Sequence, residues 1–184
     1  MKMLRIGLVA SLFACEVSAF AQDSVAKSAS ESSTVLATWS MIEKDFISAA
    51  DAMPEDKYSF SPTTGEFKGA RTFAQQVGHV ACANFAFFKE FEGTKPDEDC
   101  LYNGKEPKKN KGEIMKYLRD SFQFADQAIT KLTTQNSLDK VEGNHGGPST
   151  KLGITVLAVW HASDHYGQIV EYLRMNGIVP PASR

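Results

Sequence analysis

The sequence lacks an excess of either charge. Its 184 residues include 20 Lys and Arg and 22 Asp and Glu, which gives a formal net charge of -2. One short basic cluster, at residues 105–111, is interrupted by Pro107 and is typical of a solvated loop. Proteins that bind nucleic acid concentrate positive charge on one face. We therefore expect no nucleic-acid partner.

The sequence also lacks a hydrophobic run long enough to anchor it in a membrane. Residues 6–14 are apolar, but a membrane-spanning helix needs about 20 such residues. Two basic residues precede this run and Ala19-Phe20-Ala21 follows it, which is the pattern of a secretory signal peptide. We predict a signal peptide over residues 1–21, cleaved after Ala21. The mature protein would then lack an integral membrane segment and be periplasmic or secreted.

Cysteine is scarce, with three residues in the chain. Cys15 stands in a sequence that weakly resembles a lipid-attachment motif, although the bulky Phe13 argues against lipid attachment there. If Cys15 leaves with the signal peptide, Cys82 and Cys100 can form one disulfide in an oxidising compartment. The alternative is that Cys82, three residues after His79, points at a bound metal ion.

No repeat and no alternating strand pattern is visible. Instead, apolar residues recur at helical spacing in four segments. Ser33 or Thr34 can cap the first helix, and Ser149 or Thr150 can cap the fourth. The four predicted helices cover about residues 34–53, 72–91, 112–133 and 150–176.

These segments predict an all-α protein. Four amphipathic helices joined by loops bury their apolar stripes against one another, so we expect a four-helix bundle. The bundle domain would span residues 34–181 and follow a flexible lead-in at residues 22–33.

Two of the four histidines, His161 and His165, lie four residues apart near the C-terminus. On a helix this spacing puts both imidazoles on one face, about 6 Å apart along the axis, where they can share a divalent metal ion. Two ligands do not complete a site, and His79 in the second helix is the candidate third ligand. The alternative is a set of ordinary helix-face histidines, but an imidazole in such apolar surroundings is costly unless it is hydrogen-bonded or bound to metal.

Two further residues are candidates for a catalytic role. Gln168 follows His165 by three residues, shares its helix face and could hydrogen-bond a metal-bound water. His145 lies in a Gly-rich loop, where it is either an exposed histidine or a group that reaches over the metal. Asp164 lies about 100° from His165 around the helix and is more typical of a solvated or outer-shell residue.

With these residues in place the chain resembles the DinB-like family, DNA-damage-inducible helical bundles that include the YfiT-type metal-dependent hydrolases. The matching segments are Gln76-Val77-Gly78-His79-Val80-Ala81, residues 161–168 with their histidine pair, and the ending at residues 172–181. The resemblance covers about residues 34–181. The family name does not itself imply DNA binding.

The resemblance implies a four-helix bundle, often dimeric, whose divalent metal is held by His79, His161 and His165. Zinc or nickel is the usual metal, with iron or manganese possible, since all four accept imidazole ligands. Related thiol transferases conjugate small thiols to electrophiles. We therefore expect an exported metal-dependent hydrolase or thiol transferase acting on a small-molecule substrate. The alternative is a non-catalytic metal- or ligand-binding module of the cell envelope.

Overall fold

The computed structural model describes residues 29–66, 69–93, 110–141 and 150–184. In this part of the chain four long helices carry the fold and no strand occurs. The helices are α1 (Glu31–Ala52), α2 (Phe73–Phe91), α4 (Lys111–Ile129) and α5 (Lys151–Met175), with short 3-10 turns η1 (Glu55–Lys57) and η2 (Pro181–Ser183). The predicted all-α fold is confirmed.

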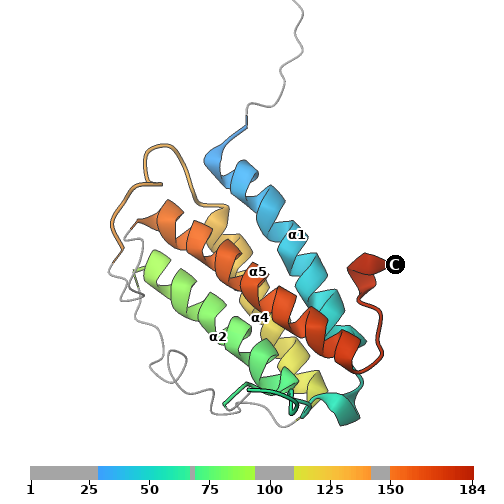
Figure 1. Cartoon of the computed structure of the whole chain (residues 1–184). Helices are drawn as coiled ribbons and strands as arrows, with labels where there is room; N and C mark the ends of the chain where they lie inside the picture. Colours follow the sequence, from blue (N-terminus) through green and yellow to red (C-terminus); the bar gives the residue numbers. More distant parts are fainter. Residues whose placement is uncertain (1–28, 67–68, 94–109, 142–149) are drawn as a thin grey trace, which may run out of the picture.

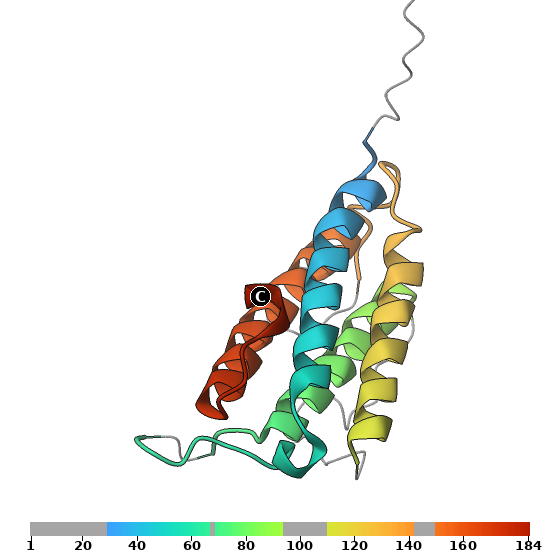
Figure 2. The same ribbon diagram turned by 90° about the vertical axis from the view of Figure 1, so that its right-hand side faces the viewer.

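The four helices form a bundle in which each packs mainly against two neighbours. The contacts join α2 to α4, α1 to α5, α2 to α5 and α1 to α4. In Figures 1 and 2, α1 and α5 run in one direction, whereas α2 and α4 run in the other. The two helices that carry the candidate metal ligands, α2 and α5, are therefore antiparallel neighbours.

The ends of α2 and α5 follow from local sequence. Thr72 and Gln75 form a capping box at the start of α2, with the Gln75 amide N 3.2 Å from Thr72 Oγ1 and the Thr72 amide N 2.9 Å from Gln75 Oε1. Thr150 caps α5 by accepting a hydrogen bond from the Gly153 amide at 3.2 Å. The start of α2 agrees with the predicted start at about residue 72, and α5 begins after Thr150, one of its two predicted caps.

Gly177 ends α5 in the way the Asn176-Gly177 pair predicts. Its φ is 72°, a left-handed conformation that glycine adopts at low cost. The amides of Gly177 and Ile178 both donate at 2.9 Å, to the carbonyls of Arg174 and Leu173 respectively. This pattern is a Schellman motif, which satisfies the last carbonyls of the helix.

Two helix boundaries differ from the prediction. The first helix begins at Glu31, before the predicted Ser33 or Thr34, because Ser30 and Ser33 form a capping box one turn earlier. Residues 31–33 of the predicted lead-in are thus helical. The third helix ends at Ile129 instead of about 133, where the Leu132 amide donates to the Ile129 carbonyl at 3.0 Å and so tightens the chain into a turn.

The core centres on four aromatic side chains that are fully buried: Trp39, Phe46, Phe88 and Phe122. The Trp39 ring lies 5.7 Å from Phe88 and 5.1 Å from Phe122, and Phe46 lies 6.2 Å from Phe122. These residues come from α1, α2 and α4, so one aromatic cluster joins three helices.

The connection between α1 and α2 is folded back onto both helices. The Tyr58 hydroxyl donates to the Ala50 carbonyl at 2.7 Å, and the Phe73 amide donates to the Phe60 carbonyl at 2.8 Å. From α5, the Tyr172 hydroxyl donates to the Arg71 carbonyl at 2.9 Å. These bonds hold the start of α2 against α5.

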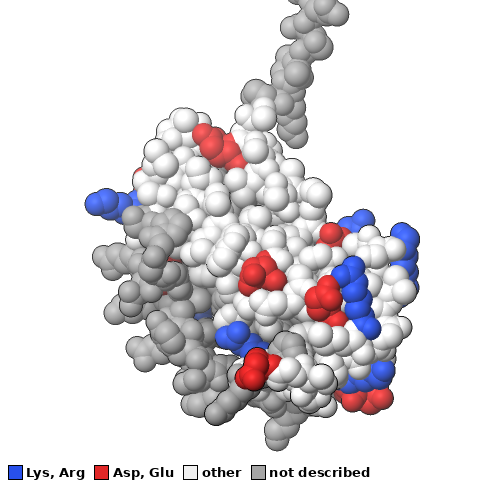
Figure 3. All heavy atoms as spheres, in the orientation of Figure 1, with Lys and Arg blue, Asp and Glu red and all other residues white. Residues whose placement is uncertain are grey.

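Charged residues of both signs are scattered over the face in Figure 3, mainly on its lower and right-hand parts, while its upper part is largely uncharged. No helix in the described residues combines the length and hydrophobicity needed to cross a lipid bilayer.

Candidate metal centre

The three histidines predicted as metal ligands come together between α2 and α5. His79 extends from α2, and His161 and His165 extend from successive turns of one face of α5. Their candidate ligand atoms all lie within 4.8 Å of one another, and the ring centroids are 4.5 to 5.0 Å apart. The sequence placed His79 on one helix and the His161/His165 pair on another, and the fold brings the three together in one cluster.

The spacing of the nitrogens fits a shared ion. The Nε2 atoms of His79 and His161 are 3.1 Å apart. With zinc–nitrogen bonds of about 2.0–2.1 Å, two ligand nitrogens are about 3.3 Å apart in a tetrahedron and about 2.9 Å apart at a right angle. The observed separation falls between these two values.

Burial keeps the imidazoles of His79 and His165 neutral. It is the main cause that lowers the pKa of His79, to about 4, with further lowering by the positive charge of Arg71 and by His165. Burial also lowers the pKa of His165, which is 7% exposed; Asp164 and Gln168 act in the opposite direction, and Arg71 lowers it further. Neutral imidazole is the form that binds a metal ion, so no proton need be displaced from these two rings at pH 7.

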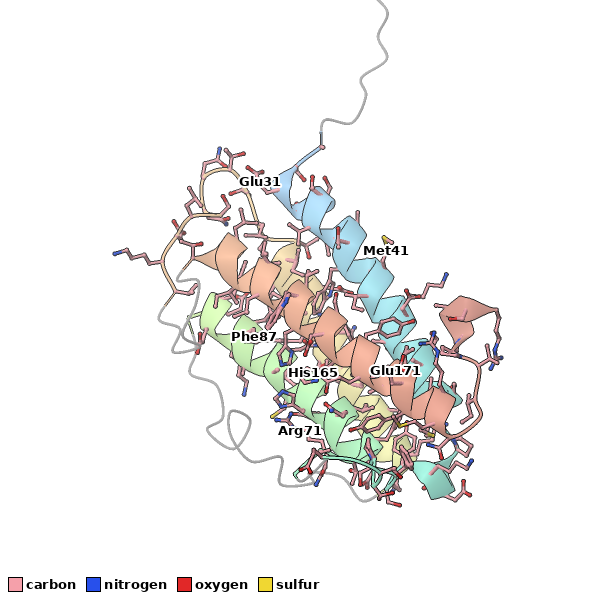
Figure 4. The ribbon with its side chains drawn as sticks, in the orientation of Figure 1. Glu31, Met41, Arg71, Phe87, His165 and Glu171 are labelled. Carbon is pink, nitrogen blue, oxygen red and sulfur yellow. The ribbon has the colours of Figure 1, made fainter. Side chains whose placement is uncertain are left out.

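One aromatic side chain, that of Phe87, lies against the cluster. Phe87 is buried, and its ring meets that of His161 edge to face at a centroid distance of 5.4 Å. Figure 4 shows Phe87 and His165 on the facing sides of α2 and α5. Phe87 comes two turns after His79 on α2, so an apolar ring from the same helix packs against His161.

Gln168 lies one turn from His165, as predicted, but its amide is already engaged. Its Oε1 accepts a hydrogen bond from Gln76 Nε2 at 2.6 Å, and its Nε2 donates to Asp164 Oδ2 at 2.9 Å. Gln168 therefore links the two histidine-bearing helices.

Gln76 and Arg71 were not predicted to take part in the site. Gln76 stands one turn before His79 in the same motif, and that spacing alone could have identified it. Arg71 lies just before the α2 cap, in the same region of the α2–α5 pair as His165 (Figure 4). No pattern in the sequence relates Arg71 to the histidines, because their proximity depends on how α2 and α5 pack.

The remaining candidates fall partly outside the described residues. His145 and Cys100 lie there, so the catalytic role predicted for His145 stays a prediction. Cys82 is disulfide-bonded, which excludes it as a thiolate ligand and agrees with the predicted role of a disulfide cysteine. Within the described part of the chain, the ligand cluster contains three histidines.

Comparisons with known proteins agree with this architecture. A family model described as the DinB superfamily matches residues 39–169, a range that includes all three histidines. A DinB-like protein from Bacillus cereus ATCC 10987 has a similar solved structure, with a TM-score of 0.64 over 80% of this chain and 93% of that chain. Their sequence identity is 15%, so this likeness concerns the fold. No curated protein matches the sequence.

Proposed function

The chain belongs to the DinB superfamily, and on that basis we propose that it is a metal-dependent enzyme whose His79, His161 and His165 bind one divalent metal ion. The observation that carries this proposal is the convergence of three imidazoles within 4.8 Å between two antiparallel helices. The reaction we propose is hydrolysis, or transfer of a thiol, on a small-molecule substrate.

The donor set supports a catalytic over a structural ion. Structural zinc sites are closed by four protein ligands, whereas catalytic sites have three and leave a position for water or substrate. A divalent ion in such a site supplies a Lewis acid that lowers the pKa of a bound water or thiol. The helices hold the ligands in place, and the Phe87 ring packs against His161.

The ligand chemistry indicates the class of metal ion that binds, a divalent transition metal, and not which member of that class it is. Imidazole suits zinc, nickel, iron and copper, and zinc and nickel are the candidates we favour over iron and manganese. Elemental analysis of the protein, purified without a histidine tag, tests both the presence and the identity of the ion. We expect about one equivalent per chain.

The His161→Ala variant tests whether the ion is bound by the three histidines. It removes one of three ligands, so we expect the bound metal to fall below a tenth of an equivalent while the helical circular dichroism persists. Unchanged metal content in this variant would rule out the three-histidine site. Substitution of Ser163, an exposed residue of the same helix, by alanine is the control and should leave the metal content unchanged.

A second candidate function is a non-catalytic metal- or ligand-binding module. The observation in its favour is that the described residues contain three histidines, all of them in the cluster that would hold the ion, which leaves no imidazole there to act as a general base. A thermal melt with and without chelator separates the two. A large loss of stability on chelation favours a structural ion, and a small loss with an exchangeable coordination position favours catalysis.

We also propose that the protein is exported. The N-terminal signal pattern supports this, and so does the disulfide at Cys82, since structural disulfides persist in oxidising compartments. Mass spectrometry of the protein expressed with its own N-terminus should give a chain that begins at Gln22. A mass that includes residues 1–21 would contradict export by cleavage.

A further inference from the structure

Next to the histidines, a second polar layer crosses the same helix interface. Gln76 precedes His79 by three residues on α2, and Gln168 follows His165 by three residues on α5. Because α2 and α5 are antiparallel, both glutamines lie one turn toward the same end of the bundle. Their side chains meet at 2.6 Å, and Gln168 also lies against the ring of His165.

Asp164 fixes the orientation of both amides. An ionised carboxylate can only accept hydrogen bonds, so the group of Gln168 that faces Asp164 Oδ2 must be its NH2. Gln168 Oε1 then faces Gln76, which must in turn present its own NH2. Flipping either amide alone would put two oxygens or two NH2 groups face to face.

This orientation leaves Gln76 Oε1 as a buried acceptor. Gln76 is 4% exposed, and its Oε1 has no hydrogen-bond donor in the described part of the chain. A buried carbonyl oxygen without a donor is unfavourable, and such groups in native proteins are normally satisfied by a water or a ligand. The arrangement thus keeps one acceptor available beside the histidine cluster.

We propose that Gln76 Oε1 accepts a hydrogen bond from the water or small ligand that occupies the metal site, and that Asp164, acting through Gln168, is the positioning residue that keeps it available. This inference rests on the proposed metal site. It assigns the site a ligand that presents an O–H or N–H donor on the side of α2 that faces Gln168.

The test measures zinc affinity, with Zn²⁺ alone as the probe, by competition with a chromophoric chelator. The Gln76→Met variant keeps the size of the side chain and removes the acceptor, and we expect affinity to fall about tenfold, as for other groups just outside a metal's ligands. In Asp164→Asn the new amide can donate to Gln168 Oε1. Because that amide can also accept from Gln168 as the carboxylate does, Gln168 takes up both orientations and occupies the acceptor for part of the time, so we expect a smaller loss of about twofold.

A double-mutant cycle separates this role from a loss of charge near the ion. If both residues act through Gln76 Oε1, Asp164→Asn causes no further loss in the Gln76→Met background. Titrations in about 1 M KCl, where the Debye length is about 3 Å, suppress the effect of the exposed charge. Glu171→Gln, which removes another exposed carboxylate from α5, is the control and should not change the affinity.

Each outcome is decisive. Additive losses, or unchanged affinity in Gln76→Met, overturn the inference and leave the three-histidine site intact. Failure of the unmodified protein to bind Zn²⁺ and, in the same competition assay, Ni²⁺ overturns the metal site itself. Circular dichroism of the metal-free variants shows whether any loss comes from unfolding.

Discussion

At the scale of single residues, the histidines combine two properties that are rarely found together by chance. Their ring nitrogens converge, and burial disfavours the charged form of His79 and His165. The lone pair of a neutral imidazole in such surroundings needs a donor or an ion. A positive charge from Arg71 beside them further disfavours protonation. The site therefore favours binding of a metal cation over protonation of its imidazoles.

The contribution of Arg71 can be measured directly. In the Arg71→Gln variant a positive charge near both rings is removed, so protonation becomes easier and the pKa values of His79 and His165 should rise. The imidazole resonances of metal-free protein, followed by NMR against pH, report both values. Arg174→Gln removes an arginine that pairs with Glu171 and should leave both values unchanged. Unchanged values in Arg71→Gln would contradict the placement of Arg71.

The lowered pKa of His79 also predicts how stability depends on pH. Between about pH 6.5 and the folded pKa of about 4, the unfolded chain binds a proton at His79 that the folded chain does not. The unfolded state gains from protonation in this window, so the metal-free protein should lose stability as the pH falls from about 6.5 toward 4. Urea denaturation at several pH values in the presence of chelator measures this loss.

The His79→Gln variant isolates the histidine from the acidic residues. Burial raises the pKa of Glu43 and of Asp126, so these carboxyls bind protons more readily in the folded state and stabilise it as the pH falls. Their effect is common to both proteins and cancels in the difference. We expect the free energy of unfolding to depend less steeply on pH in His79→Gln, and an equal slope would show that His79 is not buried as a neutral ring.

At the scale of the helices, capping residues were predictable where the sequence offers few choices. Thr72 and the Asn176-Gly177 pair each stand beside a clear change of pattern, and α2 begins after Thr72 whereas α5 ends at Asn176-Gly177. The start of α1 was predicted three residues late because Ser30, Ser32, Ser33 and Thr34 are all competent caps, and only the reciprocal Ser30–Ser33 bonds select one.

In the candidate site, features that lie within one helix could be predicted from the sequence, whereas the contact between its two glutamines could not. The i, i+4 spacing of His161 and His165 is a property of one helix and was predictable. The pairing of His79 with them was inferred from their common apolar context. The link between Gln76 and Gln168 joins residues 92 positions apart and depends on the relative heights of α2 and α5. No periodicity within either helix contains that information.

Lys111 joins the start of α4 to the end of α1, and its contribution to stability can be measured. This first residue of α4 donates from Nζ to the carbonyls of Asp51 at 2.6 Å and Met53 at 3.0 Å, and so satisfies carbonyls at the end of α1. Its positive charge also complements the negative end of the helix dipole. We expect Lys111→Met, which retains the apolar stem, to lower the free energy of unfolding by about 1–2 kcal/mol in chemical denaturation.

A second lysine of the same helix serves as the control. Lys116 forms an exposed ion pair with Asp120 at 2.6 Å, one turn along α4. Exposed pairs of this kind contribute about 0.3–0.5 kcal/mol, so Lys116→Met should have a much smaller effect. Equal effects of the two substitutions would mean that the bonds to the end of α1 contribute little.

At the scale of the whole molecule, the two tryptophans report on different regions. Trp39 is fully buried in the aromatic core, whereas Trp160, next to His161, is 62% exposed. Val156 precedes Trp160 by one helical turn and is 56% exposed, so these two residues give α5 an apolar stripe on its outer face. Exposed apolar patches often mark contact surfaces.

We predict that this stripe contributes to a homodimer, the assembly that the family resemblance implies. Light scattering after gel filtration should give twice the chain mass, and Trp160→Lys should shift the protein toward the monomer because a charge would be buried at the contact. Acrylamide should quench Trp160 fluorescence less as the protein concentration rises, while Trp39 stays inaccessible throughout. Met41→Lys, at an exposed position of α1 (Figure 4), is the matched control and should not change the mass. A monomeric mass at every concentration, with Trp160 fully quenchable, would show that the stripe faces solvent.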